Sequence, residues 1–211
     1  GMAASAALKK AVQGLGPDDL VIALICGGGS SLLPDPPPGL TLDDLQGLNE
    51  ALLASGAPIS VMNDIRKCFS RINAGRLAEL AAPAKVCTLV VSDVPGDDPG
   101  EVASGPTVPG RPDPQTVRAM IAARGITRPQ ACMTYLDGLA PGPPSGAQNT
   151  STRVIASAAL SLDAAAARAR GKGVAAWVLS DSMEGEARDV AMVPAALARQ
   201  AAATGFPYPA P

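Results

Sequence analysis

The sequence contains no histidine, and this absence limits the chemistry that the protein can perform. Catalytic triads and dyads that use an imidazole as the general base cannot operate in this chain. Any acid–base step therefore falls to an aspartate, a glutamate or a lysine.

Aromatic and charged residues are also scarce, at 2% and 17% of the chain, and the formal net charge is −2. Such a chain has no basic field to attract nucleic acid and almost no rings on which bases could stack. No apolar run approaches the roughly 18 residues of a membrane span, and the first residues lack the pattern of a secretory signal. We therefore expect neither a nucleic-acid partner nor a membrane partner.

The cysteines are widely spaced and form no CxxC motif, which argues against a zinc knuckle. Thiols spaced in this way are typical of reduced proteins, so we expect a cytoplasmic location. We expect most of them to act as small buried hydrophobic residues. They are Cys26, Cys68, Cys87 and Cys132.

Two short apolar runs, residues 20–26 and 86–91, have the pattern of parallel strands that are covered on both faces. Helical patterns lie between them, and 47% hydrophobic content in 211 residues is ample for a core. The sequence predicts an α/β fold with a doubly wound, mostly parallel sheet and helices on both faces, plus the start of a second, smaller α/β unit.

The 22 glycines and 21 prolines punctuate these elements instead of forming one disordered tract. We expect an incomplete first domain at residues 1–140, a linker at 141–150 and an incomplete second segment at 151–211. Thr41 and Asp44 form a capping box that should open a helix. Helices are expected at residues 3–13, 42–55, 60–70, 76–82, 114–124 and 161–170. A last helix is expected to start among the charged residues 184–189 and to run to about residue 203. Further strands are expected at residues 153–156 and 174–179.

A glycine-rich loop follows the first strand, at residues 27–31, and we call it the glycine loop. Its backbone N–H groups could turn toward a phosphate or a carboxylate, with two hydroxyls beside them. It lacks the lysine of a P-loop and the spacing of a dinucleotide fingerprint, so a plain tight connection is the alternative. The loop consists of Gly27, Gly28, Gly29, Ser30 and Ser31.

Three aspartates follow the second strand, where ligands of open α/β sheets are usually met. Asp93 comes directly at the strand exit, and Asp97 and Asp98 come a few residues later. These carboxylates could meet a metal or a phosphorylated substrate. An ordinary turn with Asx-type backbone bonds is the alternative, above all for Asp98.

Asn63, Arg66 and Lys67 are three and four residues apart on an expected helix. At this spacing they could reach one anion together. A solvated helix face is the alternative interpretation.

Four segments together resemble the bacterial glycerate 2-kinase family, whose members often carry the name hydroxypyruvate reductase. The resemblance covers nearly the whole chain and follows the family's order. The segments read CGGGSSLLPDPPPG, GAPISVMNDIRKCFSRINAGRLA, VSDVPGDDPGEVASGPTVPG and LSDSMEGEARDVA.

The resemblance implies transfer of the γ-phosphoryl group of ATP to the 2-hydroxyl of D-glycerate, or a similar hydroxy acid, with magnesium. It also implies two α/β domains with the site in the cleft between them. On this basis the glycine loop would hold phosphate or carboxylate, and Asn63, Arg66 and Lys67 would neutralise it. Asp93, with Asp97 or Asp98, would hold magnesium or orient the hydroxyl. Ser104, Gly105 and Thr107 would complete the backbone cradle, and Arg66, Lys67 and Asp93 are the expected catalytic residues.

The chain also departs from the family pattern. Cys68 stands at the family's histidine, Asn73 at its lysine and Ala74 at a glycine. Family members are about twice as long, so we expect a fragment with weak or no activity on its own. A sheet edge exposed in such a fragment would favour a homo-oligomer.

Two other functions remain open at this stage. The reductase of the older family name would need a nicotinamide fingerprint, and no GxGxxG with a following ribose-binding acid occurs. A non-catalytic folded remnant that binds a small anion or a partner is the second.

Overall fold

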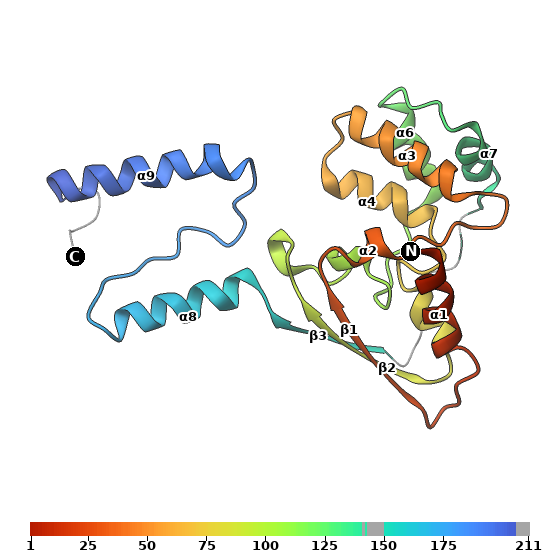
Figure 1. Ribbon diagram of the computed structural model, residues 1–211, viewed down its shortest axis with the longest axis horizontal. Helices are drawn as coiled ribbons and strands as arrows, with labels where there is room; N and C mark the ends of the chain where they lie inside the picture. Colours follow the sequence, from red (N-terminus) through yellow and green to blue (C-terminus); the bar gives the residue numbers. More distant parts are fainter. Residues whose placement is uncertain (141, 143–149, 206–211) are drawn as a thin grey trace.

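The computed structural model describes residues 1–140, 142 and 150–205. Its centre is a parallel sheet of three strands in the order β1-β2-β3. The strands are β1 (Leu20–Cys26), β2 (Lys85–Val91) and β3 (Thr150–Ala156). The predicted α/β fold with a parallel sheet is confirmed, and the first two strands lie where their apolar runs predict them (Figure 1).

One face of the sheet is covered by α1 (Met2–Val12) and α5 (Arg76–Ala81). Side chains that alternate along β1 point toward this layer, and Ala23 is buried there. The cluster also includes Val12, Ile72, Leu77, Ala78, Ala81 and Val86. This layer packs against one face of β1 and β2. The carboxyl ends of the two strands lie together at one edge of the sheet.

The other face of β1 differs from the expectation of helices on both sides. Leu20, Ile22 and Leu24 are exposed, and Leu24 is 74% exposed. In a strand, residues two apart share a face, so these three form one apolar stripe. Over the described residues, no helix buries that stripe.

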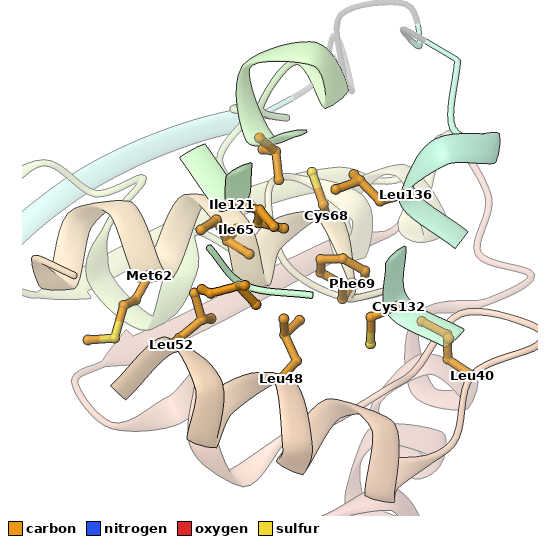
Figure 2. Packing of buried hydrophobic residues seen from close by; sticks show 12 residues of the cluster. Leu40, Leu48, Leu52, Met62, Ile65, Cys68, Phe69, Ile121, Cys132 and Leu136 are labelled. Carbon is orange, nitrogen blue, oxygen red and sulfur yellow. The ribbon is translucent and has the colours of Figure 1, made fainter. Parts of the chain in front are cut away.

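A second core lies in a helical layer beside the sheet. It joins α3 (Leu42–Ala54), α4 (Ile59–Cys68), α6 (Pro114–Ala122) and α7 (Gln130–Gly138). Figure 2 shows Leu48 and Leu52 of α3, Ile65 of α4 and Leu136 of α7 converging on this core. The layer holds α4 rigidly, which matters because α4 carries several of the predicted site residues.

The first turns of α3 and α6 are capped by the side chains that the sequence predicts. The capping box of Thr41 and Asp44 is present at the start of α3, and Asp113 caps α6. Helix α7 was not expected from the sequence. It is short, it follows Pro129, and no side chain caps its first turn. Its Cys132 and Leu136, one turn apart, bury one face against the core.

The remaining elements are short or peripheral. They are α2 (Gly29–Leu32), η1 (Pro95–Asp97), η2 (Val102–Ser104), α8 (Ala158–Arg170) and α9 (Ala187–Thr204). Figure 1 shows α8 and α9 extending away from the sheet and the helical layer.

The strand expected at residues 174–179 is wrong, because these residues form no strand and are mostly exposed. A strand needs a neighbour to satisfy its backbone N–H and C=O groups. The segment follows α8, which leads the chain away from β3, so no neighbouring strand is available among the described residues.

The expected linker at 141–150 lies mostly outside the described residues, which omit 141 and 143–149. After this segment, β3 pairs in parallel with β2. The residues expected to form a second unit therefore contribute a strand to the sheet of the expected first domain. The division into domains stays a prediction. No helix among the described residues is long and apolar enough to span a membrane.

Thiol reactivity tests the helical core. Burial raises the pKa of Cys68 and of Cys132 to about 11, whereas Cys26 is exposed. At pH 8 the two buried thiols would be thiolates in roughly one molecule in a thousand. Brief treatment with iodoacetamide, read by peptide mass spectrometry, should modify Cys26 and spare Cys68 and Cys132 until urea is added. Equal labelling of Cys68 and Cys26 in the native protein would contradict this packing.

Candidate functional site

The contact between the glycine loop and Asp93 follows from the pairing of β1 and β2. Cys26 lies opposite Val91, so the residues just after the two strands meet at the same edge of the sheet. A Cβ atom added at Gly27 would lie 1.6 Å from Oδ2 of Asp93. The carboxylate can lie against the loop because glycine has no side chain. Any other residue at position 27 would require Asp93 or the loop to move.

The rest of the glycine loop folds back on itself. Gly28 has φ +75°, and the hydroxyl of Ser31 donates to the Gly28 carbonyl oxygen over 2.8 Å. A Cβ atom at Gly29 would lie 3.1 Å from the Cβ of Ala103. The loop is therefore packed closely against η2.

Two left-handed turns support this region from behind. Ala103, Ser104 and Gly105 all have positive φ, and so do Ala74 and Gly75. The N–H of Ala74 donates to the Ser104 oxygen over 3.0 Å, and the N–H of Gly75 donates to the Gly105 oxygen over 2.8 Å. A positive φ at a residue with a side chain costs on the order of 1 kcal/mol, so the surrounding contacts must hold these turns in place.

Thr107 lies in the protein interior rather than at the loop surface. Its hydroxyl pairs over 2.8 Å with that of Thr88 on β2, and both residues are buried. The side chain of Thr107 therefore fixes the segment after η2 to the sheet. Of Thr107, only the backbone could take part in the predicted phosphate cradle.

Arg66 points toward Asn49 and Asn63. Its guanidinium donates to the amide oxygens of both residues, and the bond to Asn63 measures 3.3 Å. Burial lowers the pKa of Arg66, but an arginine starts so high that it keeps its charge. Across the described part of the chain, no carboxylate lies within ion-pair distance of Arg66.

Lys67 is turned away from Arg66 and is only 4% exposed. Its ammonium lies 2.5 Å from Glu101 and 3.3 Å from Asp64. Asn63 and Arg66 are therefore together, whereas Lys67 is neutralised elsewhere. Because Glu101 directly precedes η2, the Lys67–Glu101 pair ties α4 to the left-handed turns.

The three aspartates after β2 lie in different surroundings. Asp93 is exposed beside Gly27, whereas Oδ1 of Asp98 accepts a 2.8 Å bond from the Gly100 N–H in an Asx-type turn. Asp97 has φ +55° in the tight η1 turn. Within the described ranges, no group of three or more His, Cys, Asp or Glu residues could hold a metal ion. The metal-binding role of Asp93, Asp97 and Asp98 stays a prediction.

A cavity of about 440 Å³ opens beside the glycine loop, and we call it the Arg66 cavity. Its lining comes from the end of the glycine loop, residues 32–35, helix α3, Arg66 of α4 with the residues that follow this helix, and Ser104 of η2. Its polar side chains include those of Ser30, Ser31, Asp35, Arg66, Asn73 and Ser104.

Asn73 is the residue of this site that sequence reasoning did not assign. It is 6% exposed, and its Oδ1 accepts no hydrogen bond in the described structure. The only sequence signal was its departure from the family pattern, where a lysine is expected.

Comparison with known proteins bears on this site. A family model described as "Domain of unknown function (DUF4147)" matches residues 1–137. A protein of Agrobacterium vitis named "Putative hydroxypyruvate reductase" is 50% identical over 201 residues, which are 95% of this chain and 52% of that protein. The protein named "Glycerate kinase" of Bos taurus is 38% identical over 204 residues, 95% of this chain and 39% of that protein.

A solved structure extends the similarity to the fold. The crystal structure of a glycerate kinase from Thermotoga maritima superposes with a TM-score of 0.84 at 31% identity, over 99% of this chain and 50% of that one. The chain thus spans half or less of the length of the curated relatives reported above, 52% and 39%.

The Lys67–Glu101 pair can be tested by stability. Replacing Glu101 by Gln keeps an oxygen acceptor near the buried ammonium but removes its nearer negative charge, which leaves only the longer ion pair with Asp64. We therefore expect a loss of about 1–3 kcal/mol in the free energy of unfolding in urea. Glu50→Gln is the matched control, because Glu50 is exposed on α3 and should change stability by less than about 0.5 kcal/mol. Equal effects of the two substitutions would show that the pair does not hold η2.

Proposed function

Because the chain belongs to the family described as a domain of unknown function (DUF4147), together with proteins named glycerate kinase, we propose that it carries part of a glycerate kinase site. The reaction that we propose is transfer of the γ-phosphoryl group of ATP to the 2-hydroxyl of D-glycerate. The contact between Gly27 and Asp93 is the observation that supports it most.

Phosphoryl transfer depends mainly on positioning and on neutralising the charge of the phosphate oxygens. The glycine loop offers backbone N–H groups without side chains in the way, and Asp93 places a carboxylate directly beside them. In a chain without histidine, a carboxylate is the natural group to accept the proton of the attacking hydroxyl. We assign that task, or metal binding, to Asp93.

The oxygen donors at this edge fit magnesium. Mg²⁺ is commonly held by one or two carboxylates together with the phosphates of the substrate. Asp93 is exposed beside Gly27, and one oxygen of Asp98 accepts from the Gly100 N–H while the other stays available. Asp93 would hold the ion, with Asp97 nearby in the chain, and the ion would screen the phosphate charges from the carboxylate.

The cations take separate roles in this proposal. Arg66 faces the Arg66 cavity with amide partners only, so it is available to neutralise an anion. Lys67 acts as a positioning residue through Glu101 and does not touch the substrate. Ser104 and Gly105 form the turn behind the loop.

The proposal is tested by incubating the chain with Mg²⁺, ATP and D-glycerate and following phosphate esters by ³¹P NMR. We expect slow, glycerate-dependent formation of a phosphoester, because the chain spans only part of the length of its relatives. Asp93→Asn should lower the rate about a hundredfold or more. Asp18→Asn, which changes an exposed aspartate before β1, is the control.

Two results would contradict the kinase assignment. Hydroxypyruvate-dependent oxidation of NADH would favour the reductase named among the relatives. Absence of any phosphoester from a chain that melts cooperatively would favour the non-catalytic remnant.

Gly27→Ala separates the role of Asp93 from stability. The added methyl group would meet the carboxylate at 1.6 Å, and an exposed side chain can swing away at small cost. We expect the melting temperature to change by only a few degrees, while the phosphorylation rate falls at least about tenfold. Gly138→Ala is the control, because nothing lies within 4 Å of a Cβ atom there and its φ is not positive. Full activity of Gly27→Ala would remove Asp93 from the reaction.

A further inference from the structure

Asn49 is the residue through which helix α3 reaches the Arg66 cavity. Its place on α3 is fixed, because Leu48 and Leu52 on either side of it pack into the core of the helical layer. The side chain of Asn49 lines the cavity, and its Oδ1 accepts a hydrogen bond from Nη2 of Arg66 on α4. The guanidinium is therefore held by a residue that lies 17 positions away in the chain.

Arg66 has a second amide partner, which holds it less closely. Asn63, on the preceding turn of α4, accepts from Nη1 of Arg66 over 3.3 Å. This distance lies just beyond the usual range of about 2.7–3.2 Å for such bonds. Within the described structure, Asn49 lines the cavity and Asn63 does not. The bond to Asn49 is therefore the one that fixes the guanidinium on the side of the cavity.

The chemistry of this partner is informative, because a carboxylate of the same shape would bind Arg66 more strongly. Aspartate is nearly isosteric with asparagine and makes charge-assisted bonds to a guanidinium. A carboxylate would also neutralise Arg66, whereas an amide accepts the hydrogen bond and leaves the positive charge in place. Asp35, which also lines the cavity, is paired with Lys9 at 2.6 Å and with Arg71 at 3.2 Å.

We propose that Asn49 is a positioning residue for Arg66. It directs the guanidinium toward the cavity through a hydrogen bond, and it keeps the charge available for an anion because the amide carries none. This inference rests on the proposed function, which gives Arg66 its anion, and adds the residue that orients that arginine. Asn49 acts through Arg66 and need not touch the substrate.

The isosteric substitution Asn49→Asp separates this role from a purely structural one. It keeps an oxygen acceptor for Arg66, so the tie between α3 and α4 remains, but it adds a negative charge. We expect a melting temperature within a few degrees of wild type, or higher. We expect the affinity for inorganic phosphate, followed by NMR at the Nε–H signal of Arg66, to fall about tenfold or more. A residue that only ties two helices together would leave this affinity unchanged.

Two further variants complete the test. Asn49→Ala removes the acceptor, so the affinity for phosphate should fall about fivefold and the Arg66 Nε–H signal should shift toward that of a free arginine side chain. Gln46→Glu is the matched control for charge, because Gln46 is exposed on the same helix and lines the same cavity. It should weaken phosphate binding by about twofold or less, since an exposed charge is screened by solvent.

The outcomes separate this inference from the proposed function. The positioning role is overturned if phosphate does not shift the Arg66 signal of wild type, or if Asn49→Asp weakens binding no more than Gln46→Glu does. If Asn49→Asp does not fold, an unchanged affinity and Arg66 signal in Asn49→Ala overturn it. Phosphorylation that still depends on Asp93 would leave the kinase proposal standing in each case. If the variants behave as expected while no phosphoester forms, Asn49 positions Arg66 for an anion and the kinase proposal fails.

Discussion

The parallel pairing of β1 with β2 is the constraint on which the site depends. The register that sets Cys26 opposite Val91 brings the ends of both strands to one edge, and Gly27 then has no room for a side chain because Asp93 occupies it. A slip by one residue would turn the side chains of β2 to the other face and break this contact. The buried hydroxyl pair of Thr88 and Thr107 fixes the segment after η2 to β2.

The segments behind this edge are held by specific contacts instead of by regular structure. The left-handed turns at residues 74–75 and 103–105 bond to each other, and the Lys67–Glu101 pair links them to the helical layer. Backbone strain of this kind persists only where neighbours fix it, and it is common at functional sites. These contacts fix the wall of the Arg66 cavity beside Ser104, and they leave the buried Oδ1 of Asn73 without a hydrogen-bond donor in the described structure.

Local signals predicted most of the elements. The apolar run of β1 and the capping box of α3 each depend on neighbours in sequence, and both appear as expected. The direction of Lys67 could not be predicted, because it depends on Glu101, 34 residues away in the chain. The absence of a strand at 174–179 could not be predicted either, because a strand needs a pairing partner. The unsatisfied Oδ1 of Asn73 likewise depends on the tertiary packing of the turns around it. The proposed function rests on the family resemblance, and the geometry bears on which of the predicted residues lie together.

The most direct test of the account is paramagnetic broadening of backbone amide signals by Mn²⁺ in the presence of ATP. Mn²⁺ accepts the same oxygen donors as Mg²⁺ and broadens nearby amides strongly. If the edge formed by Gly27 and Asp93 is the phosphoryl-transfer site, signals of the glycine loop and of Asp93 should broaden first, and Asp93→Asn should abolish the effect. Broadening centred elsewhere, or unchanged in Asp93→Asn, would contradict the central claim.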